Sequence, residues 1–416
     1  EQPGPGNGTG GQLSPAMESL THVIGRAVAV SPGERFESAA EMAGQLSGVL
    51  RDFMTLRTAR PWPAPVSRFG PETELPDDSL GTVPELAWWL TQDAFRAAGD
   101  GGRLLPLPAV PDAAAARLPA PRPDPGDPAA ELVLTLSGTK AAAAIEQLAG
   151  QDSAEADLLR CRAVLSLGDI AGARDALRRA ADRCGQGDWR VRWHKALTGM
   201  AAGRHQEAFA EFSAVHRALP GELVPKLGLA LCAECLGDAR QEAERWYALA
   251  WQADQSYVSA AFGLARARIR SGDRGAAVTA VDGVQGSSRH ARTARIAAFR
   301  LLTCVTGEPA GETDGRPGDP SDEELDQAGR RLAAPPLSDR DTDLGEAHYL
   351  LDAVLLEARL HRACAPGRGG SGGAVAKLRG DLEASYRRMA AKQARTRGQH
   401  TVLVDLANQV RARSLD

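Results

Sequence analysis

Three short stretches of the chain have residue types and spacings that could bind phosphate or attack a substrate. Residues 6–11 and 367–372 both read Gly-x-Gly-x-x-Gly, the spacing of a loop that surrounds a phosphate with backbone N–H groups. Residues 369–373 read Gly-x-Ser-x-Gly, the spacing of a nucleophile elbow. These motifs act where a strand leads into a helix, because that geometry directs the backbone at the ligand. Neither phosphate motif follows a strand pattern, and the serine lies among glycines, so we predict linker sequence at all three places.

The other candidates for chemistry lack the partners that they need. Lys377 follows the second glycine motif as a nucleotide-contacting lysine would, but it lies too close to the loop, and no His-Arg-Asp or Asp-Phe-Gly motif follows it. Cys232 and Cys235 lie inside a helical pattern, where a metal site would need two more ligands at a similar spacing. We predict buried, reduced cysteines, with a redox pair or a metal site as the alternatives. The chain is therefore expected to contain no catalytic, cofactor-binding or metal-binding residue.

Composition excludes several classes of function. Of the 416 residues, 43% are apolar and 25% are charged, as in ordinary globular proteins, whereas only 5% are aromatic. The net charge of −4 gives no general footprint for nucleic acid. No apolar stretch approaches the roughly 20 residues that span a bilayer, and no charged-then-apolar leader opens the chain. We expect a cytoplasmic protein with no transmembrane segment and no nucleic-acid partner.

Breaks in the apolar periodicity divide the chain into six segments. They are a disordered start (1–14), two helices (15–57), a proline-rich connector (58–128), a helical repeat domain (129–305), a linker (306–320) and a C-terminal helical region (321–416). Proline interrupts most periodic structure in the connector. One short amphipathic helix is predicted there at residues 83–95, and its adjacent Trp88 and Trp89 are expected to dock it onto a neighbour.

Glycine recurs at a nearly constant interval within residues 153–288. The spacings between successive glycines are 35, 34 and 35 residues, and each glycine separates two stretches with helical periodicity. Helix–turn–helix units with a period of 34 residues are typical of tetratricopeptide repeats, in which each pair of helices buries its apolar face against the next pair. The predicted fold is therefore all-α, a tetratricopeptide-type α-solenoid followed by further helices. The predicted turn residues are Gly168, Gly203, Gly237 and Gly272.

The first helix of each repeat lines the concave surface of such an array, which predicts a candidate binding groove. The predicted groove residues are Trp193, Leu197, Leu227, Leu231, Phe262 and Arg266, with Arg162 and Arg190 at the rim. An apolar groove with a basic rim suits an extended or helical peptide that carries acidic groups. In the alternative interpretation, the same side chains form the core between repeats. If the groove is open, replacing Arg266 with Glu weakens partner binding and leaves the array folded.

Six stretches of the chain resemble one family, the actinobacterial serine/threonine protein kinase G family. The resemblance covers most of the chain from residue 17 onward. The matching stretches are SPGERFESAAEMAGQLSGVLRD (31–52) for the end of the kinase lobe, DPGDPAA (124–130) for the connector, PGELVPKLGLALCAECLGD (220–238), SAAFGLARARIRSGDRGAAV (259–278) and SSRHARTARI (287–296) for the repeats, and TVLVDLANQVR (401–411) for the terminal helix.

The resemblance implies a serine/threonine kinase whose repeats support the kinase and mediate dimerisation. It implies ATP and Mg²⁺ as cofactors of the parent kinase, and a small forkhead-associated-domain regulator of glutamate and 2-oxoglutarate metabolism as its substrate. The nucleotide loop, the lysine and the catalytic and metal-binding aspartates of such kinases have no match here, so residues 1–416 alone are not expected to transfer phosphate. Two alternatives stay open, a free-standing repeat adaptor and a repeat protein that binds an anionic ligand. A native mass near the chain's own 43.8 kDa would favour the adaptor.

Arg35 is predicted as a structural residue of the first helix pair. The resemblance places it as the arginine that pairs with a buried glutamate of an intact kinase lobe, and that glutamate has no match in this chain. A buried arginine without its carboxylate is costly, so we expect Arg35 to be exposed or to pair weakly with Glu34 or Glu37. The helix pair is then expected to be poorly anchored, with fast amide exchange over residues 1–60 and slow exchange over 153–288. Glu1 is expected to be a fragment boundary rather than a natural start.

Overall fold

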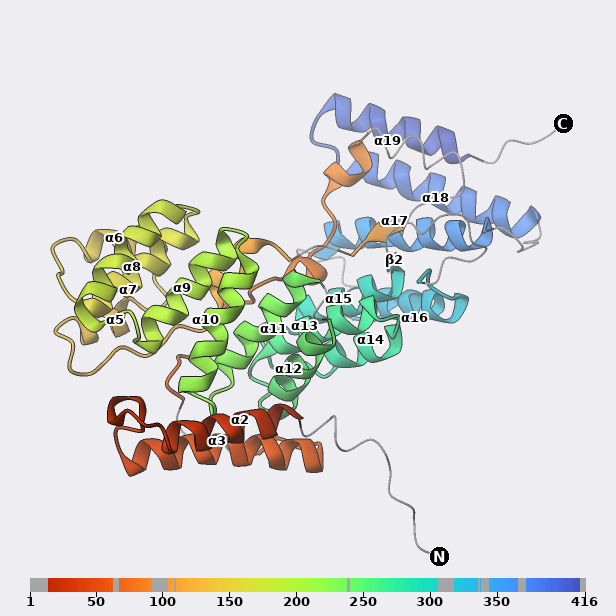
Figure 1. Ribbon diagram of the computed structural model, residues 1–416. Coiled ribbons are helices and arrows are strands. Elements are labelled where there is room, and N and C mark those ends of the chain that lie inside the picture. Colours follow the sequence, from red (N-terminus) through yellow and green to blue (C-terminus); the bar gives the residue numbers. More distant parts are fainter. Residues whose placement is uncertain are drawn as a thin grey trace, which may run out of the picture. The chain divides into compact units, whose positions relative to one another are not determined.

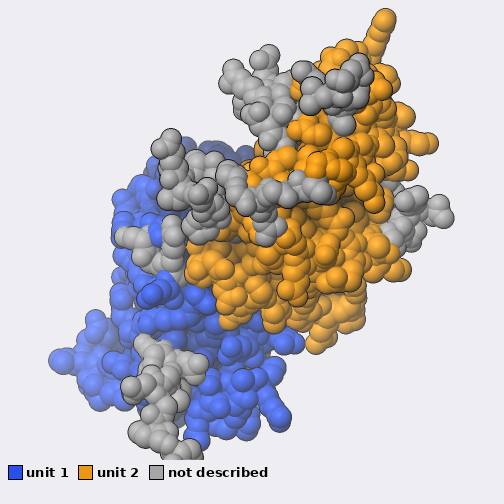
Figure 2. Space-filling view, turned by 90° about the vertical axis from the view of Figure 1, so that its right-hand side faces the viewer, with its two compact units in different colours: residues 1–77, 110–267 blue, residues 78–109, 268–416 orange. Residues whose placement is uncertain are grey.

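The protein divides into two compact units, each assembled from two stretches of sequence. The structure is a computed structural model that describes residues 14–62, 67–91, 104–107, 110–237, 240–305, 318–335, 337, 344–365 and 372–411. Unit 1 comprises Glu1–Asp77 and Val110–Ala267, and unit 2 comprises Asp78–Ala109 and Arg268–Asp416; Figure 2 colours them blue and orange. The proline-rich connector is thus shared between the two units rather than forming a linker outside them.

The described part of unit 1 is helical, as predicted. Its elements are α2 (Ser14–Ala27), η1 (Pro32–Glu34), α3 (Ala39–Thr58), η4 (Asp112–Arg117), α5 (Ala130–Leu136), α6 (Ala141–Gln147), α7 (Ala154–Ser166), α8 (Ile170–Cys184), α9 (Trp189–Ala201), α10 (His205–Ala218), α11 (Val224–Leu236), α12 (Arg240–Ala253) and most of α13 (Val258–Arg270). Helices α7 to α12 form three consecutive antiparallel pairs, which are labelled in Figure 1. The prediction of an all-α fold is confirmed.

The four glycines at the predicted turns have the backbone conformation that the repeat requires. Each lies between two successive helices of the chain and has a positive φ, a region that L-residues with a Cβ rarely adopt. The φ angles are +83° for Gly168, +68° for Gly203, +76° for Gly237 and +89° for Gly272. A helix that ends at such a residue can reverse direction within a short turn, and this explains why the glycine interval reproduces the repeat length.

Two further glycines allow neighbouring helices to approach closely. A Cβ at Gly228 of α11 would lie 2.7 Å from the ring of Phe212 on α10. A Cβ at Gly263 of α13 would lie 2.2 Å from the ring of Tyr247 on α12. Each helix therefore packs against an aromatic ring of the preceding helix, and a larger residue at either position would separate the two helices.

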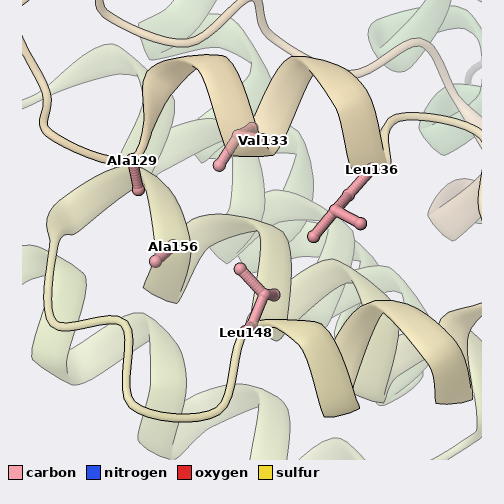
Figure 3. Packing of buried hydrophobic residues seen from close by; sticks show 5 residues of the cluster. All are labelled: Ala129, Val133, Leu136, Leu148 and Ala156. Carbon is pink, nitrogen blue, oxygen red and sulfur yellow. The ribbon is translucent and has the colours of Figure 1, made fainter.

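The first helices of the repeat domain bury a small cluster of their own. Ala129, Val133 and Leu136 come from α5 and the residue before it, Leu148 follows α6, and Ala156 belongs to α7. Figure 3 shows these side chains pointing toward one another between the three helices. Short helices such as α5 and α6 are marginal in isolation, so this shared apolar cluster stabilises them.

Unit 2 contains the remaining helices and the strands that the structure describes. Its elements are η2 (Ser79–Gly81), η3 (Leu86–Leu90), β1 (Leu105–Pro106), α14 (Arg274–Asp282), α15 (Ala291–Thr303), β2 (Cys304–Val305), α16 (Asp322–Ala333), α17 (Leu344–Ala363), α18 (Gly372–Lys392) and α19 (Arg397–Val410). Strands β1 and β2 pair in parallel. Ser321 is the N-cap of α16 and forms a complete capping box, in which the side chain of Glu324 returns to the Ser321 backbone.

The tryptophans of the connector dock within unit 2. The predicted helix at 83–95 is a shorter 3₁₀ helix, η3, and residues 92–95 lie outside the described part of the chain. Trp89 is fully buried, and its Nε1 donates a hydrogen bond of 2.6 Å to Glu357 Oε1 on α17. Tyr386 of α18 donates to the same oxygen at 2.6 Å. The docking prediction thus holds for Trp89, with a buried carboxylate as the acceptor.

The glycine motifs of the sequence lie mostly beyond the described structure. Residues 6–11 and 367–371 are outside it, whereas Gly372 and Gly373 begin α18. Residues 306–317 of the predicted linker are also outside it. Among the described helices, none is both long enough and apolar enough to span a membrane.

Candidate functional site

The predicted groove residues are buried, and part of the connector covers them. Their relative exposures are 0% for Trp193 and Leu197, 1% for Leu227, 3% for Leu231, 0% for Phe262 and 2% for Arg266. The ring of Phe69 lies 5.0 Å from that of Trp193 and 5.4 Å from that of Trp189. Further along the connector, η4 packs against α7, α9 and α11. We therefore correct the expectation of an open groove at these positions, because connector side chains fill the surface that α9 and α11 present.

Backbone and carboxylate contacts fix the connector on this surface. Glu72 accepts hydrogen bonds from the backbone N–H of Ser259 at the start of α13, at 3.1 and 3.3 Å. Two passes of the connector also bond to each other, because Gly70 N–H donates to Ala120 O at 2.8 Å. A segment that is held by both backbone and side-chain contacts belongs to the fold of unit 1 and is no loose linker.

Arg266 is the centre of a buried ion network. Its guanidinium donates two hydrogen bonds to the carboxylate of Glu234, at 2.8 and 3.0 Å, and lies 3.3 Å from Asp77 of the connector. The Tyr247 hydroxyl donates to Glu234 at 3.0 Å. Burial alone would lower the pKa of Arg266, but the Glu234 carboxylate outweighs it and raises that pKa. Arg266 therefore joins the connector to α11 and α13, and it is not available to a peptide from solution.

The two predicted rim arginines are also engaged. Arg190 is half-buried and pairs with Glu155 at 2.5 Å and with Asp188 at 2.8 Å. Arg162 donates to the backbone oxygen of Leu118, directly after η4. Burial lowers the pKa of Arg162 to about 10. The positive charges that were expected to attract an acidic peptide thus hold the chain's own elements together.

A polar junction that the sequence reading missed joins α3 to the repeats. Lys226 of α11 is fully buried, and its Nζ donates to Asp52 Oδ2 of α3 at 2.7 Å and to Pro220 O at 2.6 Å. Arg51 donates to Asp52 Oδ1 at 3.0 and 2.8 Å and to Gly221 O at 2.9 Å. Burial lowers the pKa of Lys226, and the Asp52 carboxylate opposes that shift. Buried charges of this kind require their partners, so the junction fixes α3 on the repeat array.

Glycine permits the backbone contact at the centre of this junction. A Cβ at Gly48 of α3 would lie 2.1 Å from Gly221 O, and a Cβ at Gly221 would lie 2.4 Å from Gln45 O. The side chain of Gln45 accepts a hydrogen bond of 2.7 Å from Gly221 N–H. Glycine is unfavourable in a helix interior, so Gly48 was a usable signal in the sequence. It marks the place where another backbone approaches α3.

A cavity of about 430 Å³ lies beside the junction. Its volume is within the range of small-molecule sites. The charged groups in its wall are satisfied within the chain, however: Glu222 accepts from Ser67 Oγ at 2.6 Å and from Arg68 N–H at 2.9 Å. We therefore regard it as part of the α3 junction.

The N-terminal helix pair packs against the repeat helices of unit 1, and the expectation that it is poorly anchored is wrong. Figure 1 shows α2 and α3 side by side against α10 and α12, and both helices contact that surface. Arg26 of α2 donates to Ala218 O at 2.7 Å and pairs with Glu41 at 2.8 Å. The expected fast exchange over residues 1–60 therefore no longer follows for α2 and α3.

Arg35 is exposed, as predicted, but its hydrogen bonds go elsewhere than expected. Its Nε donates to Ala29 O at 2.8 Å, within the turn between α2 and α3. Its guanidinium donates to the backbone oxygens of Ala29 and Val30 rather than to Glu34 or Glu37. Arg35 thus stabilises the turn of the helix pair.

The close cysteine pair lies in α11, as predicted. Cys232 is buried, and its thiol donates to His205 O at 3.1 Å. Burial raises the pKa of Cys232 to about 12, so the reactive thiolate is suppressed. Cys235 is half-buried. These surroundings favour the structural interpretation of the pair over a redox one.

Acid is expected to destabilise unit 1 through His194. Burial lowers the pKa of His194 to about 4, whereas histidine in an unfolded chain has a pKa of about 6.5. Below pH 6.5 the unfolded state therefore binds a proton that the folded state does not, and stability falls until the folded pKa is reached. Between pH 7 and pH 5 we expect His194 to contribute a loss of about 2 kcal/mol in the free energy of unfolding.

Urea denaturation at a series of pH values measures this loss. His194→Asn should make the profile less steep between pH 7 and pH 5, because this side chain no longer titrates. Burial also lowers the pKa of His216, which keeps its own share of the slope. His400→Asn, at an exposed position of α19, is the matched control and should leave the slope as it is. An unchanged slope in His194→Asn would mean that other groups carry the acid sensitivity.

The comparisons with known proteins agree with the helical repeats and the turn glycines. The family model described as "Protein kinase G tetratricopeptide repeat" matches residues 97–414. The chain belongs to this tetratricopeptide repeat family. It is 32% identical over 416 residues to the serine/threonine-protein kinase PknG of Mycolicibacterium smegmatis, an alignment that covers 95% of this chain and 51% of that protein. It is 31% identical over 411 residues to PknG of Mycobacterium leprae, covering 95% and 50%. The chain spans about half the length of these curated relatives.

Proposed function

We propose that this chain is the C-terminal regulatory and scaffolding region of a serine/threonine protein kinase. Family membership and the two relatives named as kinases support this proposal. The stretch at 31–52 that resembles the end of a kinase lobe forms the turn and most of α3. In this proposal the repeats provide a rigid surface on which the last helices of the lobe are fixed.

One observation carries the proposal: the helix pair is docked by one face and exposes apolar side chains elsewhere. The docked face includes the buried Asp52 and Gly48. Large apolar groups are best buried, and exposed ones that recur along two adjacent helices and the turn between them favour a surface that meets further protein. The exposed apolar side chains are Met17 (50%), Ile24 (54%), Val28 (72%), Val30 (95%), Leu46 (38%) and Leu50 (54%). We infer that the body of the kinase lobe covers them.

The proposal extends to the cofactors, location and partners of the whole protein. ATP and Mg²⁺ bind to the kinase lobe and not to the residues described here. The protein acts in the cytoplasm, and its substrate is a small forkhead-associated-domain regulator of glutamate and 2-oxoglutarate metabolism. The repeat region contributes protein–protein contacts, including a homodimer. Because the connector fills the concave surface, such contacts use other faces of the array.

A free-standing repeat adaptor is the second candidate. The docking of α2 and α3 within this chain favours it, because the helix pair has a partner surface without a kinase lobe. The mass of the native protein distinguishes the two functions. A mass near 43.8 kDa supports the adaptor, and a mass near twice that value supports the kinase.

Gly48→Ala is expected to uncouple the kinase lobe from the repeats. Its Cβ would meet Gly221 O at 2.1 Å, so α3 must move away from the loop. We expect a loss of about 2 to 3 kcal/mol in stability and faster amide exchange across residues 39–58. In the natural protein that carries the kinase lobe, we expect several-fold slower phosphotransfer to a protein substrate.

Gly44→Ala is the matched control, because a Cβ at Gly44 of the same helix has nothing within 4 Å. It should leave exchange and phosphotransfer as they are, and residues 1–416 alone should transfer no phosphate. If Gly48→Ala speeds exchange in α3 but leaves phosphotransfer unchanged, the repeats do not support the kinase. Phosphotransfer by residues 1–416 alone would place the catalytic site within this chain and contradict the proposal.

A further inference from the structure

Three side chains with metal-binding atoms meet where α2 packs on α10. Glu18 and His22 are four residues apart on α2, so they lie on one face of that helix, and His216 faces them from α10. One candidate ligand atom from each residue lies within 4.8 Å of the other two. His22 Nε2 lies 3.9 Å from Glu18 Oε1, and the two imidazole rings are 5.0 Å apart at an interplanar angle of 85°.

Neighbouring groups orient these side chains and leave a ligand atom on each. Ser19 Oγ donates its proton to Pro15 O at 3.0 Å. Because that proton is used, the 3.1 Å contact between Ser19 Oγ and His216 Nε2 is a hydrogen bond that the imidazole N–H donates. Nδ1 of His216 therefore keeps its lone pair. Arg245 binds Glu18 Oε2 at 2.9 Å and leaves Oε1 on the side of His22. Hydrogen bonds of this kind are what orients the ligands in known metal sites.

We propose that Glu18, His22 and His216 bind a transition-metal dication such as Zn²⁺. Two histidines and one carboxylate are a known ligand set for zinc, with water in the remaining position. Zinc bonds of 2.0 to 2.2 Å place tetrahedral ligand atoms about 3.4 Å apart. The measured separation of 3.9 Å between His22 Nε2 and Glu18 Oε1 exceeds this by about 0.5 Å, and the other two separations are at most 4.8 Å. Rotation of the half-buried Glu18 and His22 side chains can supply the change. A bound metal would join α2 to α10 directly.

The charges around the cluster select among metals. Arg217, Lys226 and Arg245 all act on His216 as positive neighbours. They disfavour an ion that is held mainly by charge, and three ligand residues are too few for Ca²⁺, which takes six to eight oxygens. Imidazole nitrogen forms strong bonds with Zn²⁺, Ni²⁺ and Cu²⁺. We therefore expect transition metals to bind and Mg²⁺ and Ca²⁺ not to bind. This inference does not depend on the proposed kinase function.

Titration of the metal-stripped chain tests the site. With Co²⁺ as the probe, we expect a single equivalent with the visible absorption of nitrogen and oxygen ligation, and no thiolate charge-transfer band. Zn²⁺ should compete for that equivalent and raise the melting temperature, because a metal that binds only the folded state stabilises it. Mg²⁺ and Ca²⁺ should have neither effect.

Variants separate this site from other metal-binding groups. His22→Ala should weaken Co²⁺ binding roughly tenfold or more, and Ser19→Ala, at a positioning residue, by about tenfold. His22 is half-buried, so its replacement leaves the core intact, and the exposed His400→Ala is the matched control. Three outcomes would overturn the inference. They are Co²⁺ binding that survives in His22→Ala, Co²⁺ binding that is lost in Cys232→Ala/Cys235→Ala, and no Co²⁺ binding by the native chain.

Discussion

Lys226→Met is expected to lower the free energy of unfolding by about 3 to 5 kcal/mol, the usual cost of removing one partner from a buried ion pair. Lys226 and Asp52 both have fully buried side chains, and their charged atoms are 2.7 Å apart. Methionine fills a similar volume, but it leaves the Asp52 carboxylate paired with Arg51 and without the Lys226 ammonium. The Pro220 carbonyl also loses its donor.

Urea denaturation measures the loss, and hydrogen exchange locates it. We expect amide exchange to accelerate more in residues 39–58 than in α9 and α10, because Lys226 joins α3 to α11. Lys195→Met is the matched control: its side chain is 57% exposed and pairs with Glu211 on the surface, so its loss should cost less than about 1 kcal/mol. A loss below 1 kcal/mol in Lys226→Met would mean that Arg51 alone neutralises Asp52.

The repeats could be predicted from the sequence because their determinants are local. A glycine at each turn and apolar positions at helical spacing both lie within one period of 34 residues. Gly168, Gly203, Gly237 and Gly272 accordingly have the positive φ that the turn needs. The capping box at Ser321 is equally local, because Ser321 and Glu324 are three residues apart.

The connector and the α3 junction could not be predicted in the same way because their contacts are long-range. Glu72 meets Ser259 across 187 residues, and Lys226 meets Asp52 across 174. Neither contact is accompanied by a periodic pattern or a motif from which it could be predicted. A proline-rich stretch excludes regular structure, but it does not exclude burial, and Phe69 at 1% exposure shows the difference.

The same limit explains the outcome for the candidate groove. Trp193, Leu227 and Phe262 lie in α9, α11 and α13, each the first helix of its repeat. Spacing alone could not reveal what lies against them, because a core residue and a groove residue have the same periodicity. The structure decides this by burial, and the occupant is the chain's own connector.

Arg266→Glu is expected to prevent cooperative folding of unit 1, in contrast to the expectation for an open groove. The Arg266, Glu234 and Asp77 side chains are each exposed by 3% or less. The substitution removes the cation that pairs with two buried carboxylates and adds a third carboxylate beside them. Breaking one buried pair costs about 3 to 5 kcal/mol, and the added repulsion brings the total above about 5 kcal/mol, comparable to the whole stability of many domains.

Circular dichroism during heating measures this effect, with Arg178→Glu as the matched control. Arg178 is a helix arginine whose side chain is 66% exposed, so its reversal should change stability by less than about 1 kcal/mol. Arg266→Lys keeps the charge but loses the two-bond contact with Glu234, and we expect an intermediate loss of about 1 to 3 kcal/mol in the free energy of unfolding.

If Arg266→Glu melts like the native protein, Asp77 and the connector must leave the surface of α11 and α13 without unfolding the repeats. The concave surface would then be able to open, and a peptide with acidic groups could bind there.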